Sequence, residues 1–141
     1  MGYLFDTDAL SELLRARPAK AFVKWLASVP REDQYTSAVV IGELFKGAFR
    51  SSDAARHLHN IEERLLPAVT VLPYDVAVAR QFGRLRAGLE ERGELLPDAD
   101  IQIAATSLYH GLRLVTGNLR HFERFEGLDL STAFSDTRHP G

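Results

Sequence analysis

The sequence predicts an α/β fold, a three-layer α/β/α sandwich with a mostly parallel central sheet of about four to five strands. Short apolar runs alternate along the chain with longer segments whose apolar residues recur at helical spacing. Strands that alternate with helices form parallel sheets with helices on both faces. The 141 residues suit one domain, and we find no repeat, low-complexity tract or linker.

The first third of the chain begins this alternation. A short apolar run that ends in Asp6 predicts a buried strand, and Asp8 is placed to cap the following helix, which a proline ends. A second helix is predicted over residues 19–28 and a short strand over 34–36. From Ser37 onward, apolar side chains at helical spacing predict a third helix.

The remainder continues in the same way. The predicted elements are a helix at 53–66, a strand at 69–72, a long helix from 75 to about 92, a helix opened by Pro97 and Asp98 and stopped by Gly111, a strand at 112–116, a turn around Phe122 and a last strand near Leu128. We expect residues 1–130 to form the domain and residues 131–141 to form a polar tail whose end frays.

The composition excludes several kinds of site. Without cysteine there is no disulfide, thiolate metal site or cysteine nucleophile. The apolar run at the amino terminus is too short to export or anchor the chain, and no stretch approaches a membrane span, so we expect a soluble, cytoplasmic protein. A net charge of -2 argues against nonspecific coating of nucleic acid but suits an acidic active site.

Acidic residues stand where a parallel sheet binds ligands. Asp6 and Thr116 end two predicted strands, and ligands bind beyond the carboxyl ends of such strands. A buried carboxylate there needs a cation or a proton, although Asp6 could also simply cap a helix. Glu43 borders the apolar stripe of its helix, where it could bind a ligand or pair with Lys46 at the surface.

Two more carboxylates, Asp98 and Asp100, fall in the first turn of one helix, where the helix dipole favours negative charge. Asp98 also suits the N-cap position. Together these residues place three or four carboxylates at one end of the sheet. Oxygen ligands without histidine or cysteine suit Mg²⁺ or Mn²⁺ and do not suit zinc.

Four segments carry a recognisable pattern, and they are Tyr3-Leu4-Phe5-Asp6-Thr7-Asp8, Val40-Ile41-Gly42-Glu43-Leu44, Asp100-Ile101-Gln102-Ile103-Ala104-Ala105-Thr106 and Leu114-Val115-Thr116-Gly117-Asn118-Leu119-Arg120-His121-Phe122. In order and spacing they resemble the four motifs of PIN-domain VapC toxins, the ribonucleases of type II VapBC toxin–antitoxin pairs. The resemblance covers residues 2 to about 130.

This resemblance implies an endoribonuclease that depends on Mg²⁺, for which Mn²⁺ can substitute. Asp6, Glu43 and Asp100 match the acidic positions of the family. Asp6 and Asp100 would be direct metal ligands, and Glu43 would orient water at the metal or act as general base. Thr116 and Asn118 match the polar positions of the last motif and are expected to be accessory site residues.

The sequence departs from the family pattern at three positions. Asp8 stands where many relatives have asparagine, Asn118 where some have a fourth aspartate, and His121 where an acid is frequent. The number of metal ions therefore stays open, and Asp98 could compensate as an accessory residue. His121 could donate a proton or be an ordinary surface histidine.

The resemblance also implies a VapB-like antitoxin that wraps the toxin, and a toxin homodimer. The chain offers more large apolar surface than a thin sheet covers, which could form a groove for an amphipathic helix. The residues that suggest it are Leu10, Leu13, Leu14, Phe22, Trp25, Leu26, Phe45 and Phe49.

Two other functions remain as alternatives. Asp6 and Asp8 also resemble the D-x-D motif of haloacid-dehalogenase-type phosphatases, but that chemistry needs a late lysine and none follows Lys46. A catalytically silent PIN-like module that binds RNA or a partner is the other. No G-x-G-x-x-G follows a predicted strand, which argues against dinucleotide binding.

Overall fold

Five parallel strands form one sheet at the centre of the protein. A computed structural model describes residues 1–138. The strand order is β3-β2-β1-β4-β5. The bounds are β1 (Tyr3–Phe5), β2 (Gln34–Ser37), β3 (Thr70–Leu72), β4 (Arg113–Val115) and β5 (Leu130–Ser131).

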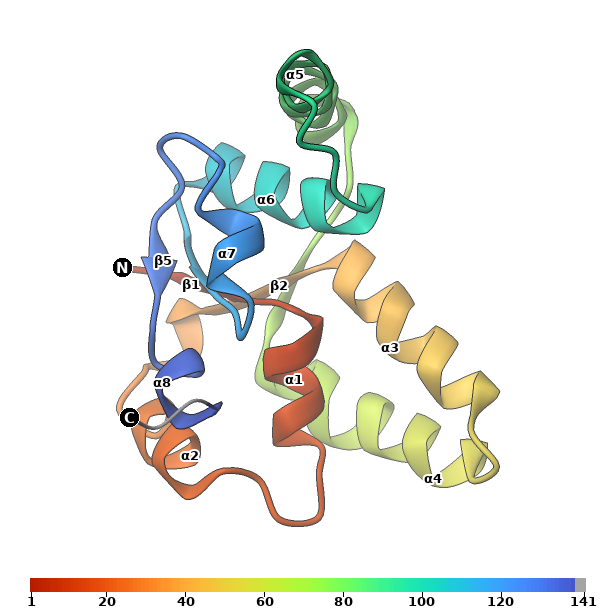
Figure 1. Ribbon diagram of the computed structural model, residues 1–141. Helices are drawn as coiled ribbons and strands as arrows, with labels where there is room; N and C mark the ends of the chain where they lie inside the picture. The colour runs from red at the N-terminus through yellow and green to blue at the C-terminus, as the bar shows by residue number, and fades with distance from the viewer. Residues whose placement is uncertain (139–141) are drawn as a thin grey trace.

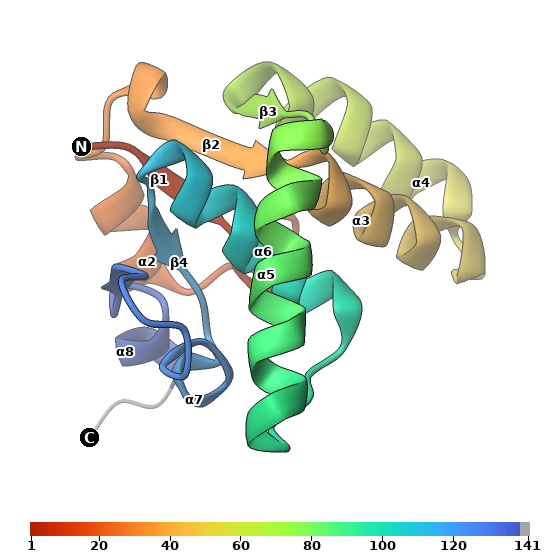
Figure 2. The same cartoon turned by 90° about the horizontal axis from the view of Figure 1, so that it is seen from above.

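Helices connect the strands and cover both faces of this sheet. They are α1 (Thr7–Leu13), α2 (Lys20–Leu26), α3 (Ala38–Arg50), α4 (Ala54–His59), α5 (Val76–Arg92), α6 (Asp98–His110), α7 (Leu119–Phe122) and α8 (Ser135–Arg138), with short turns η1 (Arg31–Asp33), η2 (Asn60–Leu65) and η3 (Leu66–Ala68). In Figure 1, α5 and α6 lie above the sheet, and α1, α2 and α8 lie below it. Figure 2 shows α5 crossing over α6. Within residues 1–138, no helix is long and apolar enough to cross a membrane.

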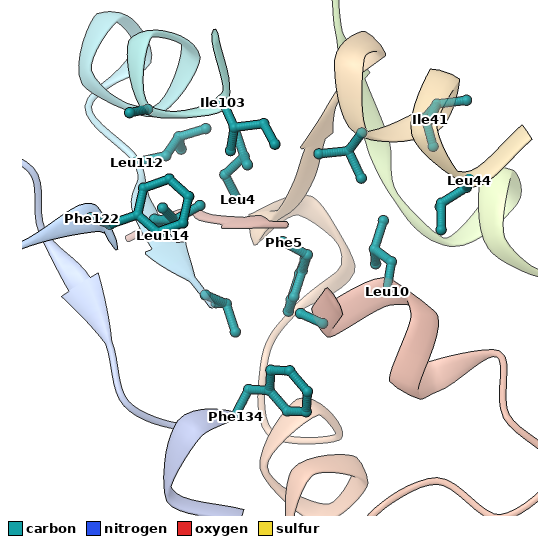
Figure 3. Close-up of a cluster of buried hydrophobic side chains, with 14 of the residues drawn as sticks. Leu4, Phe5, Leu10, Ile41, Leu44, Ile103, Leu112, Leu114, Phe122 and Phe134 are labelled. Atoms are coloured by element: carbon teal, nitrogen blue, oxygen red, sulfur yellow. The ribbon is translucent and has the colours of Figure 1, made fainter. Parts of the chain in front are cut away.

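Alternation along β1 fills the core on both faces. Successive side chains of a strand point to opposite faces, and Leu4 and Phe5 are both fully buried. Figure 3 shows Leu4 directed toward Ile103 of α6, whereas Phe5 is directed toward Leu10 of α1 and Phe134. The central strand is therefore apolar on both sides, as expected of a parallel sheet between two helical layers.

The predicted fold class is confirmed, and the observed sheet is parallel throughout. Local boundaries differ from the prediction at several points. Asp6, not Asp8, is the N-cap of α1. Pro97, not Asp98, is the N-cap of α6. In the segment predicted as one helix at 53–66, the α-helix ends at His59, and the chain continues as a π-helical turn over Asn60–Leu65. The last strand begins at Leu130, two residues after the predicted position.

The chain beyond residue 130 packs against the domain. Ser131 belongs to β5, and Phe134 is 3% exposed, with its ring 4.9 Å from that of Phe22. The segment predicted as a polar tail therefore contains a core residue, Phe134, which its mainly polar composition did not predict. The predicted fraying of the chain end falls on residues 139–141 and lies outside the described residues.

Candidate active site

The candidate site lies where the strand order reverses direction. From β1 the chain builds outward through β2 and β3, then returns to place β4 on the other side of β1. Ligands of parallel α/β sheets bind at such a switch point, beyond the carboxyl ends of the strands. Phe5 pairs with Val115 at these ends, and the backbone N–H of Asp6 donates to the carbonyl of Val115 at 3.1 Å. Asp6 and Thr116 therefore follow adjacent strand ends.

Asp6 combines a structural and a chemical role. Its Oδ1 accepts a hydrogen bond from the N–H of Ala9 at 2.9 Å, so the side chain caps α1. The residue is only 6% exposed. Burial raises the pKa of Asp6 to about 7, and the nearby Asp8 and Asp100 carboxylates add to this, whereas hydrogen bonds from Thr116 and Ala9 lower the pKa. Asp6 is thus a buried carboxylate that needs a cation to stay ionised at low cost.

Thr116 and Asn118 support Asp6 from the neighbouring strand end. The fully buried Thr116 hydrogen-bonds to the Asp6 carboxylate, and its Oγ1 accepts the N–H of Asn118 at 2.9 Å. Asn118 is the N-cap of α7, where its Oδ1 accepts the N–H of His121 at 3.4 Å. The two residues fix the loop after β4 beside Asp6.

Glu43 reaches the site from the middle of α3. Its Oε1 accepts a hydrogen bond from the Thr7 hydroxyl at 2.5 Å. This bond joins α3 to the first turn of α1, directly after Asp6. Glu43 is half-buried and therefore stays accessible to a ligand in the cavity.

Asp100 lies in the first turn of α6 and faces the histidine of α7. Its Oδ2 is 3.3 Å from Nδ1 of His121, and its side chain is 27% exposed. Partial burial raises the pKa of Asp100, and Glu43 and Asp8 raise it further, whereas the hydrogen bond and charge of His121 lower it. The imidazole therefore favours the ionised form of this carboxylate.

These side chains line one cavity of about 210 Å³, called here the acidic cavity. Its polar lining consists of Asp6, Thr7, Asp8, Glu43, Asp100, Asn118 and His121. As placed, no three of the acidic or histidine side chains within residues 1–138 converge closely enough to hold a metal ion between them. The donors are nevertheless mainly carboxylate oxygens, which suit a hard divalent cation.

The structure brings together most of the predicted site residues. Thr116 hydrogen-bonds to Asp6 but does not itself line the cavity, and Asp98 lies outside the cavity. The Asp98 side chain is 59% exposed and accepts a hydrogen bond from Nε of Arg86 at 2.9 Å. Sequence reasoning missed Thr7, whose β-hydroxyl beside Asp6 was the only available signal. It also left open His121, which contacts Asp100.

Comparisons with known proteins identify the family of the chain. The family model of the PIN domain matches residues 3–128. The chain is 33% identical to Ribonuclease VapC2 of Haemophilus influenzae over 86% of this chain and 90% of that protein. It is 35% identical to Toxin FitB of Neisseria gonorrhoeae, covering 84% and 89%. It is 32% identical to the tRNA(fMet)-specific endonuclease VapC of Shigella flexneri, covering 89% and 93%.

A solved structure shares the whole architecture. The structure of VapBC-1 from nontypeable Haemophilus influenzae superimposes with a TM-score of 0.84 at 27% identity, over 95% of this chain and 99% of that chain. The similarity in fold and in sequence thus extends over nearly the entire length of the chain. The chain belongs to the PIN-domain family and, within it, to the VapC proteins.

Proposed function

We propose that this protein is an endoribonuclease, the toxin of a VapBC-type toxin–antitoxin pair, that hydrolyses phosphodiester bonds in cellular RNA. The observation that carries the proposal is the buried Asp6 at the sheet switch point, facing Glu43 and Asp100 across one cavity. The related proteins are named as a ribonuclease, a toxin and an endonuclease that acts on tRNA. RNA and an antitoxin partner both suit a cytoplasmic place of action.

The carboxylates alone would repel a phosphodiester, so the site needs a divalent cation, for which we propose Mg²⁺ with Mn²⁺ as a substitute. Asp6 and Asp100 would hold it. When bound, the cation neutralises the phosphate charge and makes water more acidic. A single ion is compatible with these ligands, and Asp98, which pairs with Arg86 outside the cavity, does not add to them.

The chain's own side chains then have separate tasks. Glu43, fixed by Thr7, would accept the proton of the attacking water as it adds to phosphorus. Thr116 and Asn118 would hold Asp6 and the loop after β4 in place. His121 would orient the Asp100 carboxylate through their 3.3 Å contact. One P–O ester bond then breaks, and the leaving ribose oxygen takes a proton from solvent, so that two RNA fragments result.

The phosphatase alternative is not favoured. The comparisons match the PIN domain over residues 3–128, and the late lysine that a phosphoaspartate would need is missing from the sequence. A silent PIN-like module would retain RNA or partner binding without cleavage, so the cleavage assay decides between it and the enzyme.

An apolar groove beside the acidic cavity suits the antitoxin. This partner groove, of about 390 Å³, lies between α1, α3 and α4 and shares Thr7 and Glu43 with the acidic cavity. Leu14, Leu44 and Ile61 provide apolar contacts. We propose that an amphipathic helix of a VapB-like antitoxin occupies it and that a following arginine pairs with the carboxylates. A toxin homodimer remains a prediction.

The groove differs in part from the expected surface. Leu10 and Phe22 are fully buried in the core, so they are not available to a partner. Trp25 packs against Phe22 with ring centroids 5.9 Å apart. Leu14 alone of the residues predicted for this surface lines the groove, and α4 supplies the opposite wall in place of α2.

Cleavage of RNA by the purified protein with Mg²⁺ tests the function. Asp6→Asn and Asp100→Asn should each abolish cleavage and leave the fold intact, because asparagine has nearly the same shape but lacks the charge that holds a cation. The exposed Asp98→Asn is the matched control and should cleave like wild type. Full activity of the Asp6 and Asp100 variants would reject the site, and no cleavage by wild type under any metal would reject the enzyme.

A further inference from the structure

A separate cavity, rich in arginine, lies beside the segment that follows α7. It has a volume of about 550 Å³ and is enclosed by α5, the end of α6 and residues 124–126. We call it the arginine cavity, and its defining side chains are Arg84, Arg92, Arg124, Leu85, Leu108 and Phe125. None of these residues belongs to the acidic cavity or to the partner groove.

The charges around the arginine cavity are not balanced. Among the described residues, Arg84 has no hydrogen-bond or ion-pair partner. Nε of Arg92 is 3.3 Å from the Glu94 carboxylate, and Arg124 donates only to the backbone carbonyl of Glu94 at 3.5 Å. Of the described residues that line the cavity, Glu126 is the one carboxylate. Three guanidinium groups against the carboxylates of Glu94 and Glu126 leave a net charge of +1 here, in a chain whose net charge is -2.

The walls leave room for a ligand with both charged and apolar parts. Gly88 of α5 lines the cavity, and the nearest atom to a Cβ built there is Nη1 of Arg92 at 3.5 Å. Leu85 and Leu108 add apolar surface beside the guanidinium groups. Arginine binds phosphate in a bidentate manner, and apolar walls accept a sugar or a base.

One pair of aromatic rings separates the arginine cavity from the acidic cavity. Phe122 lines the acidic cavity and Phe125 lines the arginine cavity. Their ring centroids are 6.2 Å apart, and both residues are buried. The two cavities are therefore adjacent across this ring pair.

We propose that the arginine cavity is an RNA-binding subsite for the backbone next to the cleaved bond. Arg84 and Arg124 would contact phosphates, and Leu85 and Leu108 would contact a sugar or base. This inference rests on the proposed function, because it takes RNA as the substrate. It assigns to these residues the positioning of the strand and no part in the chemistry.

The test measures RNA binding without cleavage. Fluorescence anisotropy follows a labelled single-stranded oligouridylate titrated with protein in EDTA at several salt concentrations. The variant Arg84→Gln/Arg124→Gln should bind about tenfold more weakly. The slope of log affinity against log salt should shrink by about 0.7 for each phosphate that the variant no longer neutralises. Gly88→Leu, which fills the cavity but keeps the arginines, should also weaken binding.

Arg64→Gln is the matched control, because Arg64 is exposed and does not line the arginine cavity. Should the double variant fail to fold, Arg84→Gln alone carries the test, since Arg84 is exposed and unpaired among the described residues. Affinity and salt slope equal to the control in every cavity variant would overturn the proposal. So would unchanged RNA affinity with loss of antitoxin binding, which would make the cavity a protein interface. Cleavage by wild type with metal is measured separately, so failure of the proposed function is recognised on its own.

Discussion

The Thr7 hydroxyl donates to Oε1 of Glu43 across 2.5 Å, and this contact joins the helix after Asp6 to the helix that carries the proposed base. Thr7 is the residue next to Asp6. The first turn of α1 therefore holds the Asp6 carboxylate as a cap and orients the carboxylate of Glu43, which lies 36 positions after Thr7 in the sequence. The relative placement of the two carboxylates therefore depends on a residue with no charge.

Removing this hydroxyl should impair cleavage without unfolding the protein. Thr7→Val keeps the shape of the side chain, and loss of a residue that orients a ligand typically costs about 10- to 100-fold in metal affinity or activity. Steady-state kinetics should show the loss in kcat with little change in KM. Thr7→Ser retains the hydroxyl and should restore most of the rate. Equal activity of the valine and serine variants would exclude a positioning role.

The raised pKa of Asp6 predicts how the metal-free protein responds to pH. The folded-state pKa of about 7 exceeds the ordinary value of 3.8, so the folded protein holds this proton more tightly than the unfolded chain does. The stabilising effect of protonation is complete below pH 3.8 and is lost as pH rises to about 7. The raised pKa of Asp100 acts in the same direction.

Asp6→Asn removes this titration. In EDTA at pH 8 the variant should be more stable than wild type, by up to about 4 kcal/mol. The difference should shrink as the pH falls toward 4, which thermal or urea unfolding over this range measures. A constant difference between wild type and variant at all these pH values would show that the pKa of Asp6 is not raised in the folded state. Asp98→Asn, at an exposed position, serves as control.

Asp98 and Asp100 show what the sequence could predict about the site and what it could not. Both were expected in the first turn of α6, and both are there. Two residues that are two positions apart in a helix point in directions that differ by about 200° around the helix axis. Asp100 consequently faces the acidic cavity, whereas Asp98 faces Arg86 at the surface. Which of the two turns inward depends on how α6 packs on the sheet, and a pattern within the first turn does not contain that information.

The strand ends were more predictable than the short segments. Asp6 and Thr116 follow apolar runs, and the rule for parallel sheets places such residues together. His121 belongs to a helix of four residues, which is too short to show a periodic pattern. Its orientation comes from the Asn118 cap and the burial of Phe122. Contacts of this kind arise only when the chain has folded.

A divalent cation should stabilise the folded protein as well as activate it. A ligand that binds only the folded state at 100 times its Kd adds about 2.7 kcal/mol. Titration of Mg²⁺ or Mn²⁺ into metal-free protein should therefore raise Tm, and EDTA should reverse the rise and stop cleavage. Asp100→Asn should lose most of the response. A Tm that rises equally in wild type and in this variant would show that the cation binds elsewhere.

Phe134 should stabilise the domain although it lies in the segment predicted as a tail. The side chain is 3% exposed and packs on Phe22. Phe134→Ala should cost about 3 kcal/mol in the free energy of unfolding, as for other phenylalanines deleted from a core. Phe49→Ala, at a residue 69% exposed, should change stability by less than about 0.5 kcal/mol. Urea unfolding of both variants compares them, and equal effects would place the domain boundary at residue 130.

One substitution should weaken antitoxin binding at the partner groove without affecting RNA cleavage at the acidic cavity. Gly47 of α3 lines the groove, and a Cβ built there meets no atom within 4 Å. Gly47→Leu therefore adds a side chain to the groove, and its Cβ has open space. Since Gly47 does not line the acidic cavity, RNA cleavage should continue, whereas the affinity of the antitoxin helix should fall about tenfold, as for a filled hydrophobic pocket.

Gly83→Leu provides the matched control for this variant, because Gly83 also has open space around its Cβ and lies on α5, outside the groove. Co-expression with the antitoxin should protect cells from wild type and from Gly83→Leu but only weakly from Gly47→Leu. Titration of the purified antitoxin into cleavage reactions should give the same order of inhibition. If the antitoxin inhibits all three proteins equally, its helix binds on another face, and the carboxylates are reached from outside the groove.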